Sequence, residues 1–250
     1  MNWELIEQAG QISRQRHGPE VGFFLPGMFV YDGRRGRFPA LSLTGAECRL
    51  GCLHCRGRLL ETMSPAQDPD ALLKAARQVA DSGGAGLLIS GGCDKEGRLP
   101  WARFADALAR IKAETGLHVA VHSGFPDHHQ AALLKKAGVD SVMLDVIGDD
   151  ETQVAIYGLN GTNRAAESLA ALTEAGLRVV PHVVVGLHFG QLRGEERAIE
   201  MIARLRIGRV VFVVFMPLKG TPLAGLWPPP VEEVVGLMAR TRLSHPELVQ

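Results

Sequence analysis

The chain has 250 residues and carries 27 Lys and Arg against 27 Asp and Glu. This balance excludes the basic surface typical of proteins that bind nucleic acids or anionic membranes. The longest apolar run, Val210–Pro217, is far too short to cross a bilayer. The first ten residues, MNWELIEQAG, contain no apolar core of a signal peptide. We therefore expect a cytoplasmic protein that binds neither nucleic acid nor a membrane.

The first 38 residues precede any repeating pattern and are expected to form an N-terminal extension. Within them, Asn2–His17 is predicted to be a helix. The apolar segment Val21–Tyr31 is expected to cover the open bottom or side of the domain that follows. No linker marks a further boundary, so we expect one α/β domain over residues 39–250.

From Ala40 onward, short runs of Val, Ile and Leu alternate with longer segments of helical periodicity. The predicted strands are Ala40–Thr44, Gly86–Ser90, His118–His122, Ser141–Val146, Arg178–Val185 and Arg209–Phe215. The predicted helices are Pro69–Asp81, Trp101–Thr115, Asp127–Ala137, Thr162–Ala175, Glu195–Arg204 and Val231–Arg242. Six successive β-α units predict an all-parallel sheet, two units short of a (β/α)8 barrel. An open partial barrel and a flat, doubly wound sheet both fit this alternation.

Three cysteines follow the first predicted strand, in the sequence E-C-R-L-G-C-L-H-C-R. The C-x3-C-x2-C spacing of Cys48, Cys52 and Cys55 suits thiolate ligands for three irons of a [4Fe–4S] cluster, with the fourth iron open to a small molecule. A zinc site would need His54 as its fourth ligand, but adjacent residues rarely reach one tetrahedral ion together. A disulfide framework is typical of short, secreted chains. We therefore expect an iron–sulfur cluster.

Polar residues also end other predicted strands, where the site of a parallel α/β fold lies. The second strand ends in Ser90-Gly91-Gly92, and glycines let a backbone approach a ligand closely. Asp145 places a charge in an otherwise apolar strand, so it needs a partner. Such a carboxylate could hold the ribose hydroxyls of an adenosyl group.

Three histidines lie at or inside predicted strand ends. His182 and His188 are six residues apart and would share a face if their strand continued. Together with His122 they could line one polar cavity, although their spacing does not indicate a metal site. The turn Lys219–Pro222 after the last strand could bind a carboxylate or a phosphate.

These motifs resemble those of the radical S-adenosylmethionine (SAM) enzymes. The resemblance implies a partial (β/α)6 TIM-like barrel, because that family carries its cluster loop after the first strand. It also implies that SAM binds the open iron and that one electron from the cluster cleaves SAM to a 5′-deoxyadenosyl radical. The radical then abstracts hydrogen from an unactivated C–H bond.

The resemblance also assigns cofactor-binding positions. One residue of the cysteine loop, His54, stands where the family often has an aromatic residue beside the adenine. The glycine turn after the second strand matches the turn whose backbone holds the amino group of SAM. The expected SAM-binding residues are His54, Ser90, Gly91, Gly92, Ser123, Asp145 and His182.

Cys93 stands where the family commonly has Glu, and it admits three interpretations. It could be a small, buried, apolar filler. It could be a catalytic thiol that faces the radical, donating a hydrogen atom or holding an intermediate. It could also be a ligand of a second metal centre shared with a partner chain. We treat Cys93 as the candidate catalytic residue.

Further motifs, L-I-S-G-G-C, V-V-V-G-L-H-F-G and M-P-L-K-G-T-P, resemble the biotin-synthase-like branch of the family over Pro39–Pro222. Within it, the chain is similar to the radical SAM subunits of two-protein lipoyl synthases. This similarity implies sulfur insertion into an octanoyl chain carried on a protein lysine. It also implies a ferredoxin- or flavodoxin-type electron donor and a second radical SAM subunit. Only Cys93 remains after the cluster is built, so the sulfur source would be shared, lost or unlike the known ones.

Two alternative functions stay open. The first is a radical SAM isomerase or epimerase that uses Cys93 as a hydrogen donor to a small-molecule substrate. The second is a non-enzymatic iron–sulfur protein that transfers electrons or acts as a scaffold. The second is disfavoured because electron-transfer clusters rarely leave an iron open, and such a protein would not need the cavity that six β-α units supply.

Overall fold

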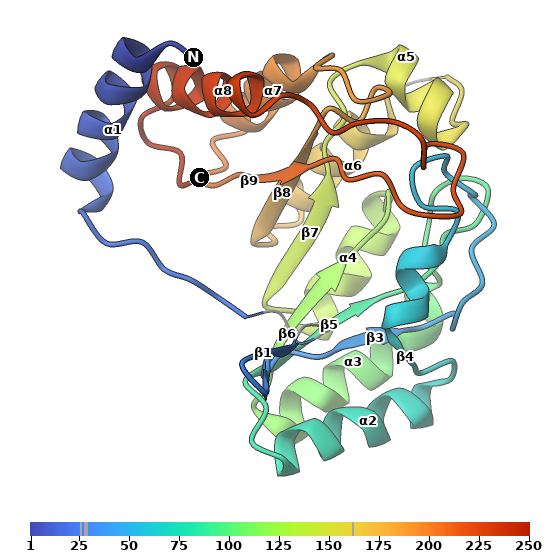
Figure 1. Cartoon of the computed structure of the whole chain (residues 1–250). Coiled ribbons are helices and arrows are strands. Elements are labelled where there is room, and N and C mark those ends of the chain that lie inside the picture. The colour runs from blue at the N-terminus through green and yellow to red at the C-terminus, as the bar shows by residue number, and fades with distance from the viewer. Residues whose placement is uncertain (26, 28–29, 162) are drawn as a thin grey trace.

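The computed structural model describes residues 1–25, 27, 30–161 and 163–250 of the chain. A parallel sheet forms its centre (Figure 1). Every pair of neighbouring strands in this sheet is parallel. In spatial order the strands are β4 (Ser64–Pro65), β3 (Ala40–Ser42), β5 (Gly86–Ser90), β6 (His118–His122), β7 (Ser141–Asp145), β8 (Val179–Val185) and β9 (Val211–Val214).

Helices follow the strands in chain order and cover one face of the sheet. They are α2 (Pro69–Asp81), α3 (Trp101–Thr115), α4 (His128–Ala137), α6 (Arg164–Glu174), α7 (Glu195–Arg204) and α8 (Val231–Ser244). Strand residues that point toward them, such as Ile89, Val121 and Leu144, are fully buried in the core. Successive side chains of a strand point to opposite faces, and the intervening residues Ser90 and His122 are only half-buried. The second face therefore lines a more accessible interior, which we call the lumen.

The sheet is an open partial barrel, as predicted. Among the described residues, β4 and β9 are its two edges and do not pair with each other. The six predicted strands correspond to β3 and to β5 through β9, and the predicted bounds of α2, α3 and α7 are confirmed. The two-residue strand β4 was not predicted.

Local capping explains where several helices begin. Asp68 accepts a hydrogen bond from the Ala71 amide at 2.8 Å and so caps α2. Asn163 caps α6 by accepting from the Ala166 amide at 3.0 Å. Thr162, the predicted first residue of that helix, lies outside the described residues.

The N-terminal extension begins with α1 (Trp3–His17), which packs against α8. It continues to a short hairpin of β1 (Val30–Tyr31) and β2 (Arg34–Arg35). The expectation that residues 21–31 cover the barrel is wrong for Phe23 and Phe24, whose side chains are 93% and 92% exposed. Positions 26, 28 and 29 lie outside the described residues. No helix in the described part of the chain has the length and apolar character needed to span a membrane.

A buried hydrogen bond links α3 to the end of β6 and gives a test of the fold. Trp101 is fully buried, and its Nε1 donates to the Ser123 carbonyl at 3.0 Å. Trp101→Phe removes this donor, so we expect it to lower the free energy of unfolding by about 1–3 kcal/mol, measured by urea denaturation. The matched change Trp227→Phe alters a side chain that is 84% exposed and should have little effect. Equal stability of the two variants would contradict this assignment.

Candidate functional site

The three cysteines lie on a loop, residues 43–57, that connects β3 to the short helix η1 (Arg58–Thr62). The loop turns tightly, with the Cys55 amide donating to the Cys52 carbonyl at 3.2 Å. It ends at Gly57, whose φ of 77° is a conformation that glycine adopts readily. Cys52 is buried, and Cys48 and Cys55 are half-buried. The loop therefore holds all three thiols at least partly out of bulk solvent.

The donor atoms of this loop fit an iron–sulfur cluster better than a single ion. Cys52, His54 and Cys55 bring their ligand atoms within 4.8 Å of one another, but Cys48 does not join that group. In a cubane cluster each thiolate binds a different iron, so the three sulfurs need not converge on one point. A hydrogen bond between the Cys52 and Cys55 thiols raises the pKa of Cys52 and lowers the pKa of Cys55 to about 4.

The turn after β5 lies directly against the cysteine loop. The Arg49 amide donates to the Cys93 carbonyl at 2.8 Å. A Cβ atom on Gly92 would lie 1.9 Å from the Glu47 carbonyl oxygen and 2.6 Å from Cys48 Cα. Since real Cβ atoms are never this close to backbone atoms, only glycine fits here. Gly92, predicted from the sequence to let the backbone approach a ligand, is thus also required for the turn to pack against the cysteine loop.

His54 carries a buried polar atom suited to a ligand. Its Nδ1 has no hydrogen-bond partner among the described residues. Leaving such an atom unpaired costs about 1–3 kcal/mol, so a bound group that pairs with it would be stabilised. The ring of His54 lies beside that of Tyr157, with 5.3 Å between centroids. An adenine beside His54 would therefore meet both a polar atom and an aromatic neighbour.

Tyr157 is a site residue that the sequence did not predict. It ends the π-helix η2 (Gln153–Tyr157), which follows the short helix α5 (Asp150–Thr152). Such π-turns occur frequently at functional sites. The buried Tyr157 hydroxyl donates to Asp145 Oδ2 at 3.3 Å. A weak signal was available, because Tyr157 is one of two tyrosines in the chain.

Side chains from β6, β7 and β8 meet in the lumen. His122 Nε2 lies 3.4 Å from Asp145 Oδ1, and His182 Nδ1 lies 3.9 Å from the same oxygen. The two imidazole rings are 5.4 Å apart between centroids. Asp145 and His182 are partners in the parallel register of β7 and β8, so they share one face of the sheet. The structure thus brings two predicted SAM-binding residues together with a predicted cavity histidine, in a group we call the lumen triad.

Burial and neighbouring charges shift the pKa values of the three side chains of the lumen triad in different directions. Burial alone would raise the pKa of Asp145, but His122 and His182 together hold it well below its usual range. Burial lowers the pKa of His182 to about 4. The pKa of His122 is raised despite its burial, because the charge of Asp145 outweighs desolvation. Asp145 is therefore ionised and His182 neutral at neutral pH.

Other predicted residues have partners within the protein. Ser90 Oγ donates to the His122 carbonyl at 3.0 Å. Ser123 is fully buried, and its hydroxyl donates to the Met143 carbonyl at 3.1 Å. His188 does not continue the face of His182, because β8 ends before it and the chain turns; it contacts Thr152 Oγ1 at 3.0 Å instead.

Cys93 is half-buried, on the turn that contacts the cysteine loop. Burial is the largest cause that raises the pKa of its thiol, and the nearby Cys48 and Asp94 act in the same direction. The thiol therefore keeps its proton at neutral pH.

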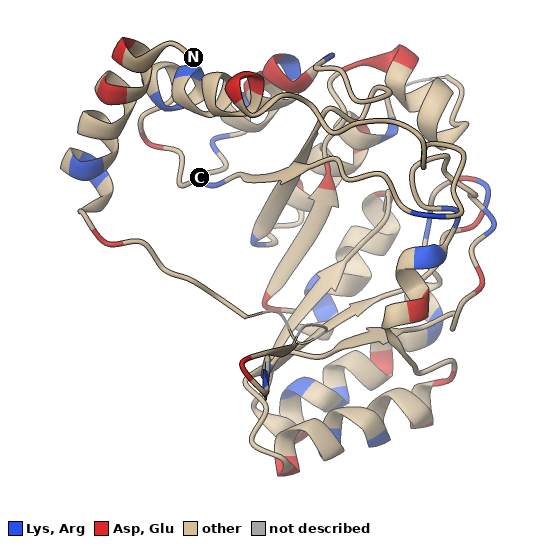
Figure 2. Ribbon diagram, viewed as in Figure 1, with Lys and Arg blue, Asp and Glu red and all other residues tan. Residues whose placement is uncertain are grey.

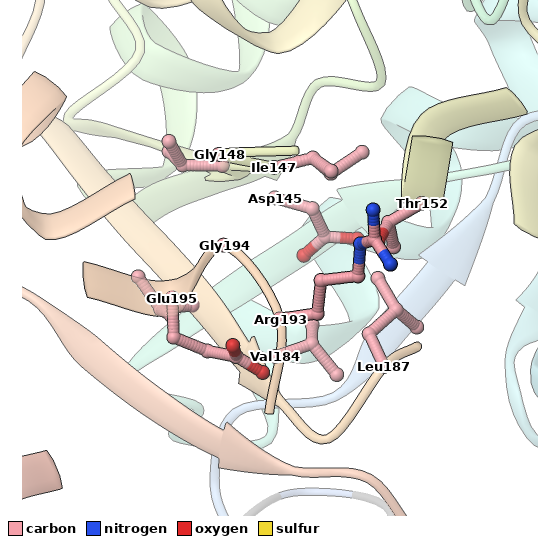
Figure 3. Close-up of a pocket in the computed structure, with 11 residues that line it drawn as sticks. Asp145, Ile147, Gly148, Thr152, Val184, Leu187, Arg193, Gly194 and Glu195 are labelled. Atoms are coloured by element: carbon pink, nitrogen blue, oxygen red, sulfur yellow. The ribbon is translucent and has the colours of Figure 1, made fainter. Parts of the chain in front are cut away.

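A pocket opens beside Asp145 at the C-terminal ends of β7 and β8 (Figure 3). Arg193 and Glu195 line it, and the sequence indicated neither. Burial raises the pKa of Glu195, whose carboxylate accepts from the Gly186 amide at 2.8 Å. Charged groups of both signs thus stand next to the lumen triad.

Residues 43–205, from the cysteine loop through α7, match the family model of the radical SAM superfamily. The chain belongs to the radical SAM superfamily. The family's cofactors are a [4Fe–4S] cluster and SAM, and they are the cofactors of this chain. Three thiols on one loop, the unpaired His54 Nδ1 and the glycine turn agree with both.

Similar proteins include two biotin synthases. The chain is 25% identical over 215 residues to the biotin synthase of Chlorobium phaeovibrioides, covering 82% of this chain and 63% of that protein. It is 29% identical over 223 residues to that of Nitratidesulfovibrio vulgaris, covering 87% and 58%. The chain thus spans less than two thirds of the length of these relatives. In fold it is similar to the solved structure of methylornithine synthase (PylB), with a TM-score of 0.71 at 15% identity, over 98% of this chain and 69% of that one.

The contact of Gly92 with the cysteine loop predicts a sharp effect on cluster assembly. Gly92→Ala forces its Cβ into the Glu47 carbonyl, so the loop must shift. We expect most of the iron and sulfide to be lost after anaerobic reconstitution, measured by metal analysis. Gly208→Ala is the control, because a Cβ there meets nothing within 4 Å. If Gly92→Ala bound as much iron as the control, the contact would not matter for the cluster.

Proposed function

We propose that this chain generates a 5′-deoxyadenosyl radical and uses it to abstract hydrogen from an octanoyl chain carried on a protein lysine, as a component of a lipoyl synthase. The observation that supports an alkyl chain as substrate is the division of the lumen into a polar wall and an apolar wall. The cysteine loop, its neighbouring turn and the lumen triad supply the polar wall. Val184 of β8, with Val211 and Val213 of β9, supplies the apolar wall.

The apolar wall consists of valines at the open edge of the barrel. His182 and Val184 pair in register with Val211 and Val213, so all four share one face. Because His182 faces the lumen triad, Val184, Val211 and Val213 line the same lumen. Val211 and Val213 remain 38% exposed, although apolar side chains gain from burial. An alkyl chain against them would remove that area from water.

Charge is distributed in agreement with this division. Charged residues lie mainly on helices and loops, and the strands are largely free of them (Figure 2). The exception at the lumen is Asp145, which stands on the polar side with its two histidines. An uncharged hydrocarbon chain and a polar cofactor would therefore meet walls of matching character.

The residues of this chain have three roles in the proposed reaction. Cys48, Cys52 and Cys55 hold the cluster, which when bound supplies the electron that cleaves SAM to the 5′-deoxyadenosyl radical. We propose that His54, Ser90, Gly91, Gly92, Asp145 and His182 hold SAM. The sequence prediction for Ser123 is not retained, because its side chain is fully buried and bonded within the protein. The apolar wall orients the substrate so that one of its C–H bonds faces the polar wall.

The similarity to biotin synthases supports sulfur insertion at the activated carbon. We propose that a second subunit supplies the sulfur and that a ferredoxin or flavodoxin supplies the electron. Cys93, as a protonated thiol, would serve as hydrogen donor if the reaction were an isomerisation instead.

The ligand count of the cluster can be tested directly. Cys48→Ala, Cys52→Ala and Cys55→Ala should each abolish the EPR signal of the dithionite-reduced cluster, because each removes one iron ligand. Cys93→Ala is the matched control and should keep the signal. An equal loss in Cys93→Ala would mean that Cys93 ligates the cluster and that the count is wrong.

The substrate can be tested without a sulfur donor. The reduced, reconstituted chain is incubated with SAM and a lysine peptide that carries a perdeuterated octanoyl group. We expect deuterium in the 5′-deoxyadenosine product, measured by mass spectrometry, since hydrogen abstraction precedes sulfur insertion. Unlabelled 5′-deoxyadenosine would reject the octanoyl substrate but retain radical chemistry, and no 5′-deoxyadenosine would reject both.

The role of the apolar wall can be tested with a variant in the same assay. Val213→Asp places a charge where the alkyl chain would lie, so deuterium transfer should fall at least about tenfold while cleavage of SAM continues. Val231→Asp, at a position 65% exposed in the first turn of α8, is the control and should retain transfer. Equal transfer in both variants would reject this wall as the substrate site.

A further inference from the structure

The π-helix η2 contacts both the cysteine loop and the lumen triad. The Leu53 amide, within the cysteine loop, donates to the Ile156 carbonyl at 2.8 Å. The next residue of η2 is Tyr157, whose hydroxyl donates to Asp145 Oδ2 at 3.3 Å. Two neighbouring residues of one helical turn therefore connect the loop that carries the three thiols to the carboxylate in the lumen.

A fully buried amide, the side chain of Gln153, links the two ends of this segment. Gln153 begins η2, and its Nε2 donates to the Leu159 carbonyl at 3.1 Å, just beyond the end of η2. Its Oε1 accepts at 2.6 Å from the amide of Arg164, the first residue of α6. A buried polar side chain is tolerated when its groups are hydrogen-bonded, and both groups of this amide are. The side chain of Gln153 thus fixes η2 relative to α6.

This link matters because of the helical geometry of η2. A π-helix is rare, and its hydrogen bonds span one residue more than those of an α-helix. If η2 relaxed to α-helical hydrogen bonding, the residues after the change would rotate by about 100° around the helix axis. Such a rotation would turn the Tyr157 hydroxyl away from Asp145. The bonds of Gln153 therefore maintain the orientation of Tyr157.

The ring of Tyr157 makes a second connection, to the cysteine loop itself. Its centroid lies 5.3 Å from that of His54 and 5.6 Å from that of Phe125. Both separations lie in the range of favourable aromatic contacts, about 4.5–7 Å. Tyr157 and Phe125 are buried, so the tyrosine ring cannot move without leaving a cavity. One side chain thus restrains both His54, expected beside the adenine, and Asp145, expected to hold the ribose hydroxyls.

We infer that Tyr157 is a positioning residue for SAM and that Gln153 holds Tyr157 in place. The hydroxyl of Tyr157 occupies Oδ2 of Asp145 and so orients the carboxylate, whose Oδ1 faces His122 and His182. This inference rests on the SAM site of the proposed function and adds the residues that position two of its members. It assigns no role in the substrate reaction to either residue.

The first test measures SAM binding to the full chain with its cluster reconstituted and oxidised, so that no SAM is cleaved. Tyr157→Phe keeps the ring and removes the hydroxyl. We expect the dissociation constant of SAM, measured by calorimetry per bound cluster, to rise about three- to tenfold at unchanged iron content. Tyr31→Phe is the matched control, because Tyr31 is the other tyrosine of the chain and is 76% exposed. Its SAM affinity should equal that of the wild type.

Asp145→Asn separates a failure of this inference from a failure of the proposed SAM site. Weaker SAM binding in both Asp145→Asn and Tyr157→Phe supports the inference. If Asp145→Asn weakens binding and Tyr157→Phe does not, the SAM site stands and Tyr157 does not position it. If neither variant weakens binding, the placement of SAM beside Asp145 is wrong, and the inference fails with it.

A double-mutant cycle tests the role of Gln153. Gln153→Leu removes both side-chain hydrogen bonds, so SAM should bind at least as weakly as to Tyr157→Phe. Because Gln153 acts through Tyr157, adding Tyr157→Phe to Gln153→Leu should weaken binding by less than it does in the wild type. A merely structural role of Gln153 would lower the amount of folded, cluster-bearing protein and leave the affinity per cluster unchanged. An unchanged affinity in Gln153→Leu, or losses that add fully in the double variant, would overturn this part of the inference.

Discussion

The site depends on one packing constraint, the contact of the Gly92 backbone with the backbone of the cysteine loop. A Cβ atom at this position would overlap the Glu47 carbonyl oxygen, at 1.9 Å. At the same junction, the Arg49 amide donates a hydrogen bond to the Cys93 carbonyl. Because the turn belongs to β5 and the loop follows β3, the pairing of these strands fixes the thiols relative to the lumen. The cluster loop is therefore positioned by the central sheet, although loops are ordinarily the most variable part of a fold.

The repeating architecture could be predicted from the sequence because its signals are local. Apolar runs of β-branched residues mark buried strands, and the pair Asp68-Pro69 marks the first turn of α2. The cysteine spacing and the strand-end residues similarly indicated most of the site. What could not be predicted depends on contacts distant in sequence. A hydrogen bond from the Leu53 amide to the Ile156 carbonyl ties the π-helix η2 to the cysteine loop. This helix places the Tyr157 hydroxyl against Asp145. Likewise, a turn at Gly186, with φ of 80°, directs His188 away from the lumen triad.

The electrostatics of the lumen follow from a single half-buried carboxylate, that of Asp145. A charge removed from water is tolerated only with close partners, and Asp145 has His122, His182 and Tyr157. The polar wall therefore carries one compensated negative charge. This arrangement follows from the strand register, because Asp145 of β7 pairs with His182 of β8 and lies two residues beyond Met143, the partner of His122.

The open edge of the barrel at β9 exposes the apolar side chains against which the proposed substrate would lie. An exposed apolar edge strand is a liability that proteins usually protect with charges or a covering segment. Here β9 keeps Val211, Val213 and Val214 more than a third exposed, and Met216 beyond it is 62% exposed. Val249 covers only the start of this edge, where its carbonyl accepts from the Val210 amide at 2.8 Å. In the proposed function, an octanoyl chain against the remaining valines would remove their apolar area from water.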